Sequence, residues 1–371
     1  MINIVFQHIR KTAFIPLVVL ILAGCEFPEN EQQKYGNESY YLDPFVFTDE
    51  CKMIKVPVPE GGIDFPVGVD DDDTARVEKA YYIGETLVTF ALYDTVSRWA
   101  RTEKKYGKYE GLFYGHNEGY KNDTNPNSPV TGYFAVGHLF YLEGQTGYET
   151  LVPIDPFYVL PIWCNAFTEW YNEKYGTNFV PVYQDSYGNP IRYINNSEPF
   201  VETANPNATG FRLPTPEEWE LAARWRGNDS VNTVTKTIND IDFSSQPIKF
   251  TRGNSSSGAK KSVDNFKEND IVAIWNINAG FLSDPISVKS KQPNALGIYD
   301  MSGNAWERTS SWEYYYLNSL NPKVVYSLCK GGSITSNYNE LAVGNNMSAM
   351  EYTWGYVAPH NTGFRTARNA E

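Results

Sequence analysis

Apolar residues recur at helical spacing in two long stretches of a chain that is otherwise irregular and polar. The stretches cover residues 90–104 and 157–174, and each places its apolar side chains three or four residues apart, on one face of a helix. The two faces consist of Phe90, Tyr93, Val96 and Trp99, and of Leu160, Cys164, Phe167 and Tyr171. Because Cys164 lies on an apolar face, we predict a small buried side chain and not a reactive thiol.

A third helix is predicted from the residues at its start. Thr215 is a favoured N-cap, Pro216 suits the first helical position, and Glu218 stands three residues after the cap. This spacing is typical of a capping box, in which the two side chains each satisfy a backbone N–H of the first turn. We therefore expect a helix that begins at Thr215 and turns Trp219 and Ala222 toward the interior.

The remainder reads as short strands joined by long loops rich in Asn, Ser, Gly and Tyr, which indicates an α+β fold with few helices. Residues 228–262 are mainly polar and residues 183–207 are similar, and we expect both to be insertions on the surface. The acidic run Asp70–Asp73 is expected to be a solvated turn, with a cation site as the alternative.

The N-terminus has the pattern of a targeting segment. Arg10 and Lys11 precede an apolar run over residues 13–23 that is too short to span a bilayer as a mature helix. The run ends in Leu-Ala-Gly-Cys at Cys25, which resembles a bacterial lipobox. We predict a signal peptide over 1–24, lipidation of Cys25 and a tether over 25–55, with Glu26 favouring the outer membrane. An ordinary cleaved signal peptide is the alternative.

Charge and cysteine content narrow the classes of function. A formal net charge of −13 argues against nucleic acid as a partner, because a phosphate backbone requires a basic face. With Cys25 lipidated, Cys51, Cys164 and Cys329 remain, an odd number that allows one bridge and one free thiol. No Cys or His spacing suggests a zinc site.

Four sequence motifs in the second half of the chain point to one protein family when they are taken together. They are Gly-Phe-Arg-Leu-Pro-Thr-Pro-Glu-Glu-Trp-Glu at 210–220, Gly-Ile-Tyr-Asp-Met-Ser-Gly-Asn-Ala-Trp-Glu at 297–307, Lys-Gly-Gly-Ser at 330–333 and Gly-Phe-Arg at 363–365. Together they resemble the formylglycine-generating-enzyme (sulfatase-modifying factor) family, a branch of the C-type lectin fold. The resemblance implies one domain of this α+β fold over residues 56–371.

The same resemblance bears on catalysis. The family's oxidases bind copper with two cysteines that follow the Lys-Gly-Gly-Ser motif, and here these positions hold Ser336 and Leu341, which supply no thiolate. An iron-dependent branch uses His and carboxylate ligands, but His116, His138 and His360 show no compact ligand spacing. We therefore expect a protein that is not an enzyme.

The resemblance also implies a calcium site. Asn304 and Glu307 match a turn that in some family members binds calcium through oxygen ligands. The alternative is that both residues only brace the turn. A second family calcium site uses an acid before Pro293-Asn294, where this chain has Lys289 and Lys291. No cofactor is required by this reading, and a structural calcium ion is the one candidate.

The stretch 333–365 is rich in Asn, Ser, Tyr and Trp, which are the residue types of adaptable binding surfaces. Its position near the end of the chain resembles the variable region of C-type-lectin-fold proteins that retroelements diversify. The candidate ligand-binding residues are Ser336, Asn337, Tyr338, Asn339, Asn345, Asn346, Ser348, Glu351, Tyr352, Trp354 and Tyr356. Leu341, Val343 and Phe364 are expected to be buried support.

These expectations together favour a lipid-anchored binding protein on the cell surface. Its ligand would be a protein or a carbohydrate, and its contact with the membrane would be through the lipid anchor. Two alternatives stay open at this point: a structural accessory lipoprotein of the envelope, and an oxidase of the formylglycine-generating type.

Overall fold

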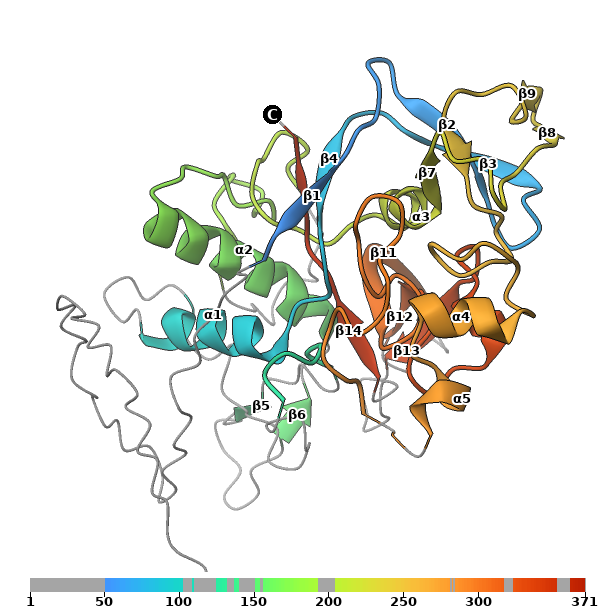
Figure 1. The fold of residues 1–371 in the computed structure, drawn as a ribbon. Helices are drawn as coiled ribbons and strands as arrows, with labels where there is room; N and C mark the ends of the chain where they lie inside the picture. The colour runs from blue at the N-terminus through green and yellow to red at the C-terminus, as the bar shows by residue number, and fades with distance from the viewer. Residues whose placement is uncertain are drawn as a thin grey trace, which may run out of the picture. The chain divides into compact units, whose positions relative to one another are not determined.

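The helices that the sequence predicts are present in the computed structural model (Figure 1). The structure describes residues 51–102, 109, 125–131, 137–139, 151–153, 156–192, 204–280, 282, 284–316, 323–351 and 361–370. The helices are α1 (Phe90–Thr102), α2 (Pro156–Tyr175), α3 (Pro216–Arg224), α4 (Phe266–Val272) and α5 (Asn276–Ala279), the last two of which were not predicted. None of the helices in the described part of the chain combines the length and the apolarity needed to cross a membrane.

The capping box of α3 is confirmed. The Glu218 N–H donates to Thr215 Oγ1 over 3.1 Å, and the Thr215 N–H donates to Glu218 Oε2 over 3.0 Å. Pro216 follows the cap, where its missing N–H removes no helical hydrogen bond. Trp219 and Ala222 are both fully buried, so the face predicted to point inward does so.

Helices α1 and α2 pack around one aromatic cluster. Trp163 and Phe167 of α2 are fully buried, and Phe167 stacks on Phe211 with ring centroids 4.1 Å apart. Cys164 is also fully buried in this cluster, as predicted, and burial raises the pKa of its thiol far above the usual range. Phe364, near the C-terminus, meets Trp163 edge-on at 5.3 Å, so the last motif of the chain is fixed to the helices.

Short strands form the rest of the fold. One sheet has the order β1-β4-β15, another has the order β13-β12-β11-β14, and four strand pairs complete the set: β2–β3, β5–β6, β7–β10 and β8–β9. The strands are β1 (Met53–Val56), β2 (Ile63–Val67), β3 (Asp73–Val77), β4 (Tyr81–Gly84), β5 (Gly137–Leu139), β6 (Leu151–Pro153), β7 (Trp225–Gly227), β8 (Thr237–Ile238), β9 (Ile241–Asp242), β10 (Lys249–Phe250), β11 (Trp306–Tyr316), β12 (Lys323–Lys330), β13 (Met347–Glu351), β14 (Thr362–Phe364) and β15 (Ala367–Asn369).

The two ends of the described chain meet in one sheet. Strand β4 pairs with β1 on one side and with the final strand β15 on the other, both antiparallel (Figure 1). The first strand begins at Met53, slightly before Val56, where the sequence placed the start of the domain. Strand β14 runs parallel to β11, which sets Gly363 opposite Glu307. This pairing brings the motifs at 297–307 and 363–365 together.

The predicted surface insertion at 228–262 is partly wrong. It contains β8, β9 and β10, and its three consecutive serines, Ser255, Ser256 and Ser257, are buried. Burial is tolerated because the hydroxyls find partners: Ser257 Oγ donates to the Ala223 carbonyl over 2.7 Å. Small polar side chains can therefore line a tight interior. In the other insertion, residues 193–203 lie outside the described residues, and Tyr187 is exposed at a turn.

Candidate functional site

A buried ion pair joins the motifs that the β11–β14 pairing brings together. Both the Arg365 and the Glu307 side chains are fully buried, and Nε and Nη2 of Arg365 each donate to one carboxylate oxygen of Glu307. Glu307 Oε2 also accepts a hydrogen bond from Trp219 Nε1 over 2.8 Å, and Arg365 Nη1 donates to the Gly84 carbonyl. A bidentate pair with these extra bonds offsets the desolvation of both charges.

Asn304, the other predicted calcium ligand, is also fully buried. Its Oδ1 accepts from the Ile286 N–H over 3.0 Å, and its Nδ2 donates to the Ile286 carbonyl over 3.2 Å. These contacts give Asn304 and Glu307 the bracing role that the sequence left open, and calcium binding there stays a prediction. Within the described ranges, no group of three or more His, Cys, Asp or Glu side chains is placed to hold a metal ion.

Asp300 is a buried carboxyl beside this pair. Burial raises its pKa to about 6, although the Lys289 N–H, which donates to Asp300 Oδ2 over 2.9 Å, and the Arg365 charge act in the opposite direction. Glu307 adds a second nearby negative charge, which raises the pKa of Asp300 further. The backbone of Asp300 is left-handed, with φ at 57°, so it also shapes the turn before β11.

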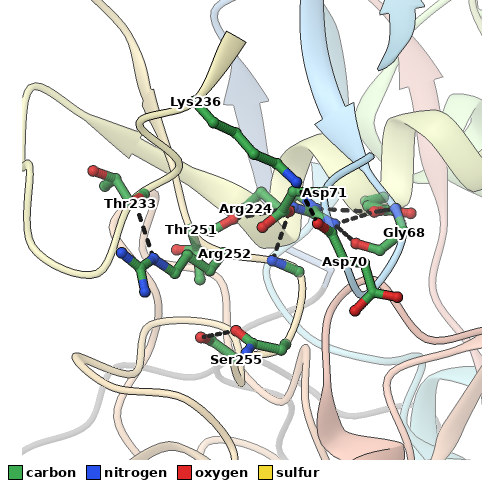
Figure 2. Close-up of polar contacts among 12 residues, drawn as sticks. Gly68, Asp70, Asp71, Arg224, Thr233, Lys236, Thr251, Arg252 and Ser255 are labelled. Atoms are coloured by element: carbon green, nitrogen blue, oxygen red, sulfur yellow. Dashed lines mark hydrogen bonds and ion pairs between the residues drawn. The ribbon is translucent and has the colours of Figure 1, made fainter. Parts of the chain in front are cut away.

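A second buried charge network begins in the acidic run (Figure 2). Asp71 is buried and accepts from Arg224 Nη1 at 2.5 Å and from the Gly253 N–H at 2.8 Å, so the prediction of a solvated turn is wrong at this position. The Asp70 carbonyl accepts from Lys236 Nζ at 2.7 Å. A charged residue within an acidic run is buried here because Arg224, on α3, supplies its counter-charge.

The network continues to the C-terminal stretch. Arg224 also donates to Glu220 Oε1, and Glu220 Oε2 accepts from Lys330 Nζ at 2.6 Å. Lys330 Nζ in turn donates to Asn346 Oδ1, also at 2.6 Å. Desolvation lowers the pKa of Lys330, which is almost fully buried, while the Glu220 carboxylate opposes that shift. Four alternating charges therefore connect the loop before β3 to the loop before β13.

Close backbone packing fixes the segment between these contacts. A Cβ on Gly344 would lie 2.2 Å from backbone atoms of Gly68, so only glycine allows this approach. The Gly344 N–H donates to the Gly253 carbonyl over 3.0 Å, and the Val343 N–H donates to the Ser255 carbonyl over 2.9 Å. We call residues 341–344 the frame. Its Leu341 and Val343 are fully buried, as predicted, and so is Phe364.

The two positions at which the family's oxidases have copper-binding cysteines hold no thiol. Ser336 is buried and its Oγ accepts from the Ser333 N–H over 2.9 Å, while Leu341 is fully buried among apolar side chains. Cys329 packs instead with Trp306, and burial raises the pKa of its thiol. Of the three histidines considered, His138 lies on β5, and His116 and His360 lie outside the described residues.

The structure separates the predicted ligand-binding residues into five groups. The exposed ones are Asn337, Asn339 and Asn346, and the partly exposed ones are Tyr338 and Asn345. Ser336 is buried, so it does not lie on the binding surface for which it was proposed, because its hydroxyl closes a turn. Ser348 and Glu351 lie on β13, and Tyr352, Trp354 and Tyr356 lie outside the described residues.

Helices α4 and α5 border this surface and were missed by the sequence reasoning. The exposed ring of Phe266 on α4 lies 5.3 Å from the Tyr338 ring, and the Asn276 N–H at the start of α5 donates to the Ser336 carbonyl. One signal was available: Asn265 is the N-cap of α4, and its side chain accepts from the Glu268 N–H. An Asn followed three residues later by Glu is a helix-start pattern, although in a polar stretch it is easily taken for a loop.

Comparisons with known proteins agree with this architecture. The sulfatase-modifying factor enzyme 1-like domain matches residues 163–370, more than half of the chain. The crystal structure of CarF superposes with a TM-score of 0.54 at 21% identity, over 86% of this chain and 99% of CarF. Treponema denticola variable protein 1 gives a TM-score of 0.49 at 21% identity, over 86% of this chain and 95% of that chain. The predicted α+β C-type lectin fold is confirmed.

Curated relatives match a smaller part. Chaperone protein LppX of Paenibacillus barcinonensis is 29% identical over 151 residues, which are 40% of this chain and 47% of LppX. Serine/threonine-protein kinase pkn1 of Chlamydia pneumoniae is 26% identical over 166 residues, which are 41% of this chain and 21% of the kinase. The chain therefore spans less than half the length of these relatives.

Proposed function

This chain belongs to the sulfatase-modifying factor enzyme 1-like family, and we propose that it is a ligand-binding member of that family and not an oxidase. One observation carries the proposal: the two positions that would hold a copper-binding thiol pair are a hydrogen-bonded Ser336 and a core Leu341. Neither side chain can bind Cu(I) as a thiolate does. These two positions therefore supply no thiol chemistry, and the surface of the fold remains as the part that can serve a function.

The proposal is supported by the contrast between the frame and the residues beside it. The frame is fixed by backbone hydrogen bonds and by the burial of Leu341 and Val343, whereas Asn337, Asn339 and Asn346 are exposed on either side of it. Side chains on a rigid support lose little conformational entropy when a ligand binds. Changes at Asn337 and Asn339 would alter specificity and leave the fold intact, whereas Asn346 also accepts a hydrogen bond from the buried Lys330.

In this proposal the C-terminal surface is diversified by a retroelement, and the protein is displayed on the cell. Lipid on Cys25 would hold the domain at the bacterial outer membrane, and the ligand would be a protein or a carbohydrate. Diversification that acts on adenines would target Asn codons, in which the surface is rich. Exchange of Asn337 or Asn346 would remove no buried apolar contact, whereas exchange of Leu341 would open the core.

Population sequencing tests this proposal directly. We expect variation among sister cells at the codons of the exposed asparagines, with unchanged codons for Leu341, Val343 and Phe364, and a near-copy of the segment close to a reverse transcriptase gene. An invariant segment together with one constant protein partner would instead establish the accessory lipoprotein.

Two biochemical measurements test the other parts. Purified protein is mixed with Cu(I) and a cysteine-containing peptide, and the rate of thiol oxidation is measured. We expect this rate to be no higher than in the control without protein. Stoichiometric tight copper with turnover would contradict the binding role. For the anchor, labelled palmitate is expected to enter the wild-type protein and not Cys25→Ser, and equal labelling would refute lipidation at Cys25.

A further inference from the structure

A buried ammonium group contacts the exposed side chain of Asn346. The Lys330 side chain is 1% exposed, and its Nζ donates to Glu220 Oε2 and to Asn346 Oδ1, each over 2.6 Å. The centre of the Trp219 ring lies 5.8 Å from the same nitrogen. Within the described residues, these two oxygens are the hydrogen-bond acceptors of the ammonium. Position 346 therefore supplies one of the two acceptors of a buried charge.

The rest of the charge network does not depend on position 346. Arg224 forms ion pairs with both Asp71 and Glu220. Two carboxylates thus balance two cations, and Asn346 adds an acceptor without adding a charge. Lys330 is the member of the network whose hydrogen bonds depend on the candidate binding surface.

The other exposed candidates differ from Asn346 in this respect. Asn337 Oδ1 accepts from the Asn339 N–H over 3.0 Å, which is a local turn. The Asn339 side chain is exposed and makes no hydrogen bond to another residue in the described part of the chain. A substitution at Asn339 therefore takes no partner from a buried group, whereas one at Asn346 can.

We infer that Lys330 restricts the side chains that position 346 of the candidate surface can carry to those with an acceptor atom. The inference rests on the proposed function only in treating this segment as the binding surface. Asn and Asp place an oxygen on the ammonium, whereas an apolar side chain would leave a buried donor without its partner, which is unfavourable. Lys330 is thus a positioning residue, and the surface offers a ligand a polar contact at position 346.

Urea denaturation of the full-length protein tests the restriction. Leu is similar in size to Asn and can cover the ammonium, but it offers no acceptor. We expect Asn346→Leu to lower the urea midpoint by about 0.5 M or more. Asn346→Asp keeps an oxygen and should stay within about 0.2 M of the wild type. The matched control, Asn339→Leu, makes the same change at an exposed asparagine and should also stay within about 0.2 M.

A second background removes the ammonium itself. Lys330→Met together with Glu220→Gln removes one charge of each sign, which leaves Asp71 paired with Arg224. Adding Asn346→Leu to this background should shift the midpoint by less than about 0.2 M, because the donor that required an acceptor is gone. Each shift is measured against its own parent, so a less stable background does not affect the comparison.

Three results would overturn the inference. They are equal losses for Leu and Asp at position 346, a loss for Asn339→Leu as large as that for Asn346→Leu, and the same loss for Asn346→Leu in both backgrounds. If the second background does not fold, the first two comparisons decide the matter.

Sequencing of sister cells separates this inference from the proposed function. We expect residues with acceptor atoms at position 346 and both polar and apolar residues at position 339. Apolar residues that are as frequent at 346 as at 339 would refute the restriction and leave a diversified surface in place. A segment that is invariant at both positions would refute diversification, and the urea comparison would then decide the role of Lys330 by itself.

Discussion

The helical region and the charged region of this protein are held together by different forces. We define the helical region as α1, α2 and the aromatic cluster around Phe167, and the charged region as α3, β11–β14 and the loops that contact them. In the first, stacked rings such as Phe167 and Phe211 are buried without ionic partners. In the second, Arg365, Glu307, Arg224 and Lys330 are all buried, each against an opposite charge.

This difference matters for function because the proposed binding surface is attached to the charged region. Apolar packing has no direction, so it permits small shifts, whereas hydrogen-bonded ion pairs fix both distance and angle. Asn346 is bonded directly to Lys330 and thereby inherits the geometry of the network. Rigidity of the candidate surface therefore comes from the buried charges together with the close backbone packing of the frame, and stability of the fold comes from both regions.

The largest expected effect is the loss of one buried charge. Arg365→Met leaves Glu307 in the core without its counter-ion and should lower the free energy of unfolding by about 3–5 kcal/mol. Urea denaturation measures this, and a second substitution, Glu307→Gln in the same chain, should recover part of the loss. A loss below about 1 kcal/mol in the single variant would contradict the importance of the pair.

A substitution in the aromatic cluster of the helical region should lower the free energy of unfolding by a similar amount. No second substitution of a charged residue should recover this loss. Phe167→Ala removes a ring that stacks on Phe211 and Trp163, and we expect a loss of about 3–5 kcal/mol in urea denaturation. The loss should not depend on pH, because no charge is exposed or neutralised. Phe167→Leu, which keeps most of the volume, should lose less. Equal losses for the two variants would argue against packing as the cause.

Asp300 offers a gain of stability in the charged region. Its pKa is about 6 in the folded protein and near 3.8 in the unfolded chain, so rising pH destabilises the fold between these values. Asp300→Asn should therefore stabilise the protein by about 3 kcal/mol at pH 7, with the gain vanishing below about pH 4. Thermal melting across pH 4–8 tests this. A gain that persists unchanged at low pH would show another cause than ionisation.

The smallest expected effect is at the start of α3, which connects the two charge networks. Thr215→Ala removes the acceptor for the Glu218 N–H and should lower the free energy of unfolding by about 1 kcal/mol. Thr215→Ser keeps that acceptor and is the control. Should the two variants unfold at the same urea concentration, the capping bond would have no measurable role.

Much of the helical region was predictable from the sequence, and much of the charged region was not. The stripes that include Val96 and Phe167 repeat locally, so periodicity alone identified α1 and α2. The burial of Asp71 depends on Arg224, which lies 153 residues further along the chain. No local pattern reports a contact across that separation. Likewise, Ser255 lies in a polar stretch that was predicted to be a surface insertion. The composition of that stretch does not show which groups its side chains form hydrogen bonds with.

The candidate site shows the same division. The sequence by itself determined the family motifs, the frame of buried residues, the missing thiols at Ser336 and Leu341, and the region in which binding residues were sought. Tertiary structure decided that Ser336 is buried, that Asn346 is oriented by Lys330, and that Phe266 borders the surface. The physical reason is that residue type and spacing are local properties, whereas exposure and the direction of a hydrogen bond depend on which distant segments pack beside a residue.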